Sequence, residues 1–166
     1  MPGQQGPPGQ QGPPGQQGPP GQQGPPGAGI PGFAFIYDTT QQSNLASGAQ
    51  VTFNTNGNIT PPGFVTHSVG TAPITITQTG TYLITYEVFP QQGTSAFALF
   101  NGNNQIAGSN YGSGSGNQTY SGQVVTTLNA SDVITLRNID GQTTLSNNVS
   151  PSTPVNSASI VILRLA

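Results

Sequence analysis

The sequence predicts an all-β head preceded by a collagen-like stalk, on three observations. Glycine recurs at every third position near the N-terminus. Short apolar or alternating runs, separated by Gly, Asn, Pro and Ser, fill the rest of the chain, a pattern typical of a β sandwich or barrel. No window shows a sustained helical period, and β-branched residues dominate the runs. We therefore divide the chain into a stalk with its joint, residues 1–32, and a head, residues 33–166.

The stalk consists of four copies of Gly-Gln-Gln-Gly-Pro-Pro that begin at Gly3. Only glycine fits at the crowded axis where three polyproline-II chains wind together, so an unbroken period of three predicts a collagen triple helix. Because a triple helix needs three parallel chains, the same period predicts a homotrimer. The expected axis positions are Gly3, Gly6, Gly9, Gly12, Gly15, Gly18, Gly21, Gly24 and Gly27.

The glycine phase breaks over residues 27–32, Gly-Ala-Gly-Ile-Pro-Gly. The same six residues match the Gly-x-Gly-x-x-Gly pattern of dinucleotide-binding folds. That pattern has meaning only between a strand and a helix, and here a collagen repeat precedes it and no helical period follows. We interpret the break as a register slip at the joint between stalk and head, and we expect no bound cofactor.

All Leu, Ile, Val and Phe residues follow residue 27, so only the head can bury an apolar core. We expect tight turns at Asn56-Gly57, Asn101-Gly102 and Asp140-Gly141. The predicted strands are Phe33–Asp38, Gln50–Asn54, Gly63–Val69, Pro73–Gln78, Gly80–Pro90, Ser95–Asn101, Asn104–Tyr111, Thr119–Leu128, Val133–Ile139 and Ser157–Leu165.

Two of these strands differ in how their apolar residues alternate. In residues 80–90 one face is more apolar and should meet the core. The last strand is apolar on both faces and must be covered on both, either by a neighbouring subunit or by loops of its own chain. The resulting candidates for the core or the trimer interface are Tyr82, Ile84, Tyr86, Glu87, Ile160, Val161, Ile162, Leu163 and Leu165.

Charge is scarce: the chain has two Arg, no Lys and four acidic residues, for a net charge of −2. Nucleic-acid binding is excluded because phosphate contacts require a basic surface. No apolar run reaches the length of a membrane span, so we expect no membrane insertion. Glu87 lies in an apolar strand and either pairs with Arg137 or Arg164 or stays in solvent.

The residues for enzyme chemistry are also missing. His67 is the single histidine, and without cysteine it has too few companions for a zinc site. No Gly-x-Ser-x-Gly elbow occurs, and the glycine-serine run at 112–116 has no lysine to make a phosphate-binding loop. We therefore predict no catalytic residue, no cofactor, no metal and no enzymatic activity, with His67 held by local contacts.

The head resembles the tumour necrosis factor and first-complement-component superfamily. The residues that carry this resemblance are 79–86 (Thr-Gly-Thr-Tyr-Leu-Ile-Thr-Tyr), 99–103, 122–128 with 132–136, and 158–165. The resemblance implies a jelly roll of about ten strands in two antiparallel sheets, forming a tight threefold trimer without enzymatic activity. With its collagen stalk, the whole chain is similar to the collagen-like surface glycoproteins of the Bacillus exosporium.

That resemblance implies a structural filament protein on the spore or cell surface, whose head trimerises and nucleates the stalk. The implied partners are two further copies of the chain and an anchoring protein, reached through an N-terminal segment that this sequence lacks. The stalk has no Thr for sugar attachment, so stalk glycosylation is not carried over. The alternative is an adhesion head, as in a phage tail fibre, binding a receptor or glycan through Asn110-Tyr111 and residues 117–120.

Overall fold

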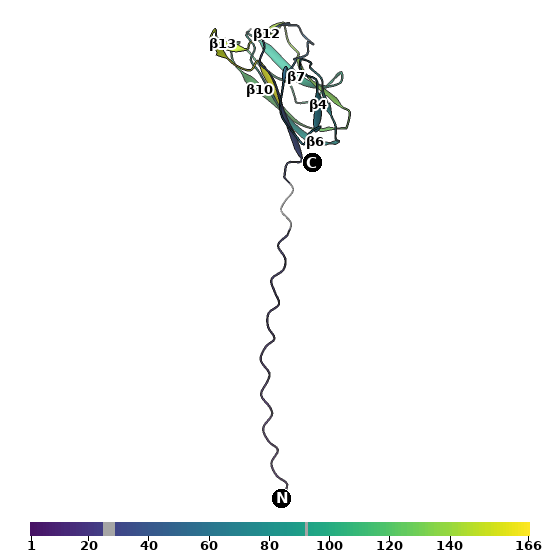
Figure 1. Ribbon diagram of the computed structural model, residues 1–166, viewed down its shortest axis with the longest axis vertical. Coiled ribbons are helices and arrows are strands. Elements are labelled where there is room, and N and C mark those ends of the chain that lie inside the picture. Colours follow the sequence, from purple (N-terminus) through teal and green to yellow (C-terminus); the bar gives the residue numbers. More distant parts are fainter. Residues whose placement is uncertain (25–28, 92) are drawn as a thin grey trace.

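The computed structural model describes residues 1–24, 29–91 and 93–166. The strands that follow residue 31 form the head, a sandwich of two antiparallel β sheets. Residues 1–24 contain no helix or strand and extend away from the head (Figure 1). The stalk leaves the head at the end that also carries the C-terminus (Figure 1). Among the described residues there is no helix of the length and apolarity that crossing a membrane requires.

The first sheet contains five strands in the order β10, β6, β15, β1, β3, and every neighbouring pair is antiparallel. Its centre is β15, the last strand of the chain, which pairs with β1 on one side and β6 on the other. The bounds are Gly32–Asp38 for β1, Thr55–Thr60 for β3, Gly80–Val88 for β6, Tyr120–Leu128 for β10 and Ala158–Arg164 for β15.

The second sheet has the order β4, β5, β11, β7, β8, and β9 pairs with β7 beside β8. These strands are β4 (Val65–His67), β5 (Ile74–Ile76), β7 (Ser95–Asn101), β8 (Asn104–Gln105), β9 (Tyr111–Ser113) and β11 (Val133–Asn138). Two short ladders complete the head: β2 (Gln42–Leu45) with β12 (Thr143–Leu145), and β13 (Asn148–Ser150) with β14 (Thr153–Pro154).

The core lies between the inner faces of the two sheets. Tyr82, Ile84 and Tyr86 of β6 are fully buried, and Phe97 and Leu99 of β7 are buried opposite them. The Tyr86 hydroxyl crosses the sandwich to donate to the carbonyl oxygen of Phe97 at 2.7 Å. Burial raises the pKa of Tyr86, so this phenol remains a neutral donor. The bond satisfies a polar group that would otherwise be costly to bury.

Asp38 at the end of β1 is a buried carboxylate that joins three parts of the head. It accepts hydrogen bonds from the Thr40 hydroxyl at 2.9 Å, the Gln42 amide at 2.6 Å and the Ser157 hydroxyl at 3.0 Å. These donors lie after β1, in β2 and just before β15. Without them the desolvated charge would be strongly unfavourable, so the network fixes the chain around it.

The predicted turn at Asn56-Gly57 is wrong, because both residues lie inside β3. A methyl group on Gly57 would lie 2.8 Å from the carbonyl oxygen of Phe35, so this glycine allows close approach of β1 rather than a turn. The β1–β3 register shifts nearby, between Ala34 and Ile36, as expected at a β-bulge.

Other strand predictions differ from the structure in the polar segments. Residues 50–54 form isolated bridges at Gln50 and Phe53 instead of a strand, and residues 104–111 hold the short β8 and the start of β9. The short strands β2, β12, β13 and β14 were not predicted, since they are two to four residues long and rich in polar side chains. Asn101-Gly102 does turn, between β7 and β8, with Gly102 at φ 57°.

Gly122 of β10 should tolerate no side chain. A methyl group there would overlap the ring of Tyr86 and lie 2.7 Å from the ring of Tyr111. We expect Gly122→Ala to lower the free energy of unfolding by about 1–3 kcal/mol through overpacking. Urea unfolding at equal protein concentration measures this change. Gly114→Ala is the matched control because a methyl group there meets nothing within 4 Å; equal losses in both variants would contradict the packing argument.

Candidate subunit interface

The outer face of the first sheet carries side chains that alternate with those in the core. The antiparallel registers align these outward residues in rows that cross β1, β15, β6 and β10. Of the rows that cross all four strands, the one nearest the stalk consists of Phe33, Leu163, Leu83 and Val125. The next row consists of Phe35, Val161, Thr85 and Gln123. The third row consists of Tyr37, Ser159, Glu87 and Ser121.

The face therefore changes from apolar to polar along the strands. The first row, which we name the apolar row, has four large apolar side chains across four strands, a width of about 14 Å at the usual strand spacing. The third row, the polar row, lies about 14 Å further from the stalk, two rows along the strands. An apolar stripe with a polar border is the usual composition of a protein interface.

The head itself covers this face only partly. Phe33, Leu83 and Leu163 are half-buried, whereas Val125 is 60 % exposed. On β1, the rings of Phe35 and Tyr37 stack on each other with their centroids 5.1 Å apart. A sheet that is apolar on both faces gains stability when its second face is also covered.

The centre of the outer face of the second sheet is covered in part by an arginine of its own chain. The Arg137 guanidinium lies over the Phe100 ring, 4.6 Å from its centroid, and its Nε donates to the Thr135 hydroxyl at 2.9 Å. Ala98, the cross-strand neighbour of Arg137, is fully buried. Among the described residues of the two sheets, the broad apolar row lies on the first sheet.

The residues proposed from the sequence fall into two groups. Tyr82, Ile84, Tyr86, Ile160 and Ile162 lie in the core of their own chain. Val161, Leu163, Leu165 and Glu87 lie on or beside the outer face. Phe33, Phe35, Leu83 and Val125 were not among the candidates from the sequence, although Phe33–Tyr37 is apolar on both faces in the same way as the last strand.

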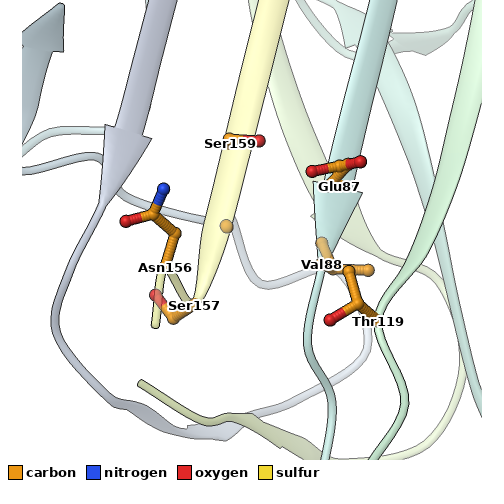
Figure 2. A pocket seen from close by; sticks show the side chains of 7 residues that line it. Glu87, Val88, Thr119, Asn156, Ser157 and Ser159 are labelled. Atoms are coloured by element: carbon orange, nitrogen blue, oxygen red, sulfur yellow. The ribbon is translucent and has the colours of Figure 1, made fainter. Parts of the chain in front are cut away.

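A small cavity of about 30 Å³ lies at the polar end of the face (Figure 2). Its lining is Glu87, Val88, Thr119, Asn156, Ser157, Ala158 and Ser159. Figure 2 shows Glu87 and Ser159 on neighbouring strands, with Thr119 and Asn156 nearer the strand ends. The volume suits about one water molecule. In the described part of the chain, no three His, Asp or Glu side chains come together in a way that would hold a metal.

The sequence left two alternatives for Glu87, an ion pair with an arginine or exposure to solvent. In the structure of the single chain, the Glu87 side chain is exposed to solvent. Arg164 donates instead to the Gln78 side chain at 2.8 Å and to the Thr79 carbonyl oxygen at 2.9 Å. Arg137 is engaged on the other sheet.

His67 lies at the end of β4 and both ring nitrogens have polar neighbours. Nδ1 is 2.6 Å from the side-chain oxygen of Asn56, and Nε2 is 2.9 Å from the carbonyl oxygen of Thr71. The ring thus bridges β3 of one sheet and the segment after β4 of the other. A groove of about 340 Å³ passes beside it, lined by Thr66, His67, Ser68, Thr71, Pro73 and Thr75. Both ring nitrogens of His67 thus contact polar atoms of its own chain, as predicted from the sequence.

Tyr111, the aromatic of the adhesion hypothesis, lies on β9 with 41 % of its surface exposed. Its ring rests on Gly122 of β10 and closes the edge of the sandwich. Tyr120 at the start of β10 is half-buried and its hydroxyl lies 3.1 Å from the Ser95 hydroxyl. Burial raises the pKa of Tyr120. These contacts give both tyrosines a role in packing.

In the stalk, residues 1–24 are exposed throughout. A methyl group added to any of the eight glycines from Gly3 to Gly24 would meet nothing within 4 Å in this chain. The ninth predicted axis position, Gly27, lies outside the described residues, as do the first two residues of the Gly-x-Gly-x-x-Gly match. Gly32, its last residue, begins a strand and not a helix.

The fold is similar to that of several solved structures. The globular domain of zebrafish complement 1qA is 13 % identical with a TM-score of 0.58, over 81 % of this chain and 98 % of that one. Murine APRIL is 12 % identical, with the same TM-score and coverage. The PRD1 vertex protein P5 is 13 % identical with a TM-score of 0.56, over 84 % of this chain and 100 % of that one.

These likenesses confirm the predicted fold class: the head is an all-β, two-sheet jelly roll of the complement and tumour-necrosis-factor type. A scan of the sequence against protein-family models and a search of curated proteins find no match.

Leu163→Glu tests whether another chain covers the apolar row. Leu163 pairs with Phe33 and Leu83 in the middle of that row. A carboxylate placed there would be buried without a partner, which we expect to weaken association by at least about 3 kcal/mol per chain. Light scattering should show the mass falling to that of one chain. Val69→Glu, at a site 61 % exposed outside the two sheets, should keep the parental mass; an associated Leu163→Glu variant would argue against this interface.

Proposed function

We propose that the chain is a structural surface protein whose head trimerises and thereby assembles a collagen triple helix from the glycine repeat of its stalk. The observation that carries the proposal is the apolar row on the outer face of the first sheet, next to the end from which the stalk leaves. Three copies that bury this row against one another would bring three stalks to one place.

The glycines of the stalk support the same stoichiometry. Within one chain nothing approaches the glycines from Gly3 to Gly24, so no intrachain contact requires the absence of a side chain there. The strict period has a physical cause when two other chains pack against the same positions. The stalk and the head thus both lack partners that two further copies would supply.

The head would act on the stalk through effective concentration. Aligning three separate chains into the first turn of a triple helix has a large entropic cost. A preassembled head removes most of this cost by holding the three stalks together at one end, where the local concentration is in the millimolar range.

The expected location is the outside of a spore or cell, as in the collagen-like exosporium glycoproteins that the sequence resembles. A stalk that displays only Gln and Pro between its glycines, and a head with four acidic residues and two arginines, offer few groups for specific chemistry. We place the protein in a surface filament, held by an anchoring partner, and assign it no reaction.

Mass and protease resistance test the proposal together. Light scattering should give three times 16.9 kDa, about 51 kDa, for the intact protein. In the cold, circular dichroism should show the positive band of a triple helix, and residues 1–24 should resist proteases that cut unfolded chains. A 16.9-kDa particle would overturn the proposal. A trimer whose stalk is digested at once would show that the head trimerises without assembling a triple helix.

A further inference from the structure

Along the last strand, apolar side chains continue beyond the apolar row to the stalk-side end of the head. Val161, Leu163 and Leu165 follow one another on the outward side of the last strand, and Leu165 is 47 % exposed. Strand pairing extends past the end of β15. The Leu165 amide donates to the carbonyl oxygen of Thr81 at 2.7 Å, and the Thr81 amide donates to the carbonyl oxygen of Ala166 at 3.0 Å. Hydrogen bonds therefore fix the backbone at Leu165, while its apolar side chain remains exposed.

The chain that enters the head is fixed at the same place. Gly32 pairs with Arg164, and a methyl group on Gly32 would overlap the ring of Phe64, so the backbone lies directly against that ring. Two residues earlier, Ile30 is 61 % exposed. Since Gly32 lies opposite Arg164, Ile30 and Leu165 are brought to the same end of the β1–β15 pair.

The glycine phase explains why this place needs additional contacts. Gly29 and Gly32 are out of phase with the period from Gly3 to Gly24, so triple-helical packing cannot continue unbroken into the head. Between the stalk and the apolar row, other side chains must hold the three chains together. Among the described residues, Ile30 and Leu165 are large apolar side chains exposed there.

The short chain between the glycine repeat and the head limits how far Ile30 can lie from the stalk. Ile30 is six residue steps after Gly24, so the two lie at most about 22 Å apart even when the chain is fully extended. In the trimer proposed above, the three Gly24 residues meet at the stalk axis and the three Leu163 residues meet in the head. The copies of Ile30 and Leu165 lie in the short neck between these two contacts.

We infer that Ile30 and Leu165 of three chains pack into an apolar collar that couples the head to the stalk. This inference rests on the proposed trimer and adds a surface that its two parts do not include. The collar excludes water at the phase break and sets the positions from which the three strands enter the triple helix. Its partner is a second and third copy of the same two side chains.

The test is the double variant Ile30→Ser with Leu165→Ser, compared with Val69→Ser with Val149→Ser. The control residues are 61 % and 62 % exposed and lie in the β4–β5 connection and on β13, away from the neck. We expect both variants to keep the trimeric mass by light scattering. The stalk of the collar variant should melt at least roughly 5 °C lower by circular dichroism, whereas the control should melt as the parent does. Ile30→Leu with Leu165→Ile should restore most of the difference.

The outcomes separate the collar from the proposed function. A collar variant that remains trimeric and whose stalk melts with the control overturns the collar alone. A collar variant that falls to single chains also overturns it, because the two residues would then belong to the head interface. If the unsubstituted protein is itself monomeric, the proposed function fails before the collar is tested.

Discussion

The structure depends on one sheet that is apolar on both of its faces. One face of the first sheet forms the core with the second sheet, and that contact completes the fold of a single head. The other face carries the apolar row of Phe33, Leu163, Leu83 and Val125. Burying such side chains stabilises a protein by roughly 1.5–3 kcal/mol each, so a partner for this face contributes energy that folding alone leaves unused.

The direction of the polarity gradient matters as much as the apolar area. The apolar row is next to the stalk, and the polar row of Tyr37, Ser159, Glu87 and Ser121 is furthest from it. Association that buries the first row most tightly pulls the subunits together at the end where the stalks emerge. The same end holds the C-terminus and the start of β1 (Figure 1). In the proposed trimer, the neck would lie between the head contact and the triple helix, and both contacts would have threefold symmetry.

The sequence predicts the fold class and most long strands because their alternation is local. The apolar alternation of β6 and β15 is readable within nine and seven residues. The turn predicted at Asn56-Gly57 failed because the demand for glycine comes from Phe35, a residue of another strand. The rows of the outer face were also beyond sequence reasoning: Phe33, Leu163, Leu83 and Val125 become neighbours only through the registers of three strand pairs.

The scarcity of charge determines what kind of association remains possible. Arg137 is stacked on Phe100, and Arg164 holds Gln78 and Thr79, so both cations are engaged within their own chain. Glu87 is exposed in the polar row, where Ser159 and Ser121 are its cross-strand neighbours. Electrostatic attraction between subunits therefore has few groups to act through. In the trimer proposed above, association would depend on apolar burial, which salt does not screen.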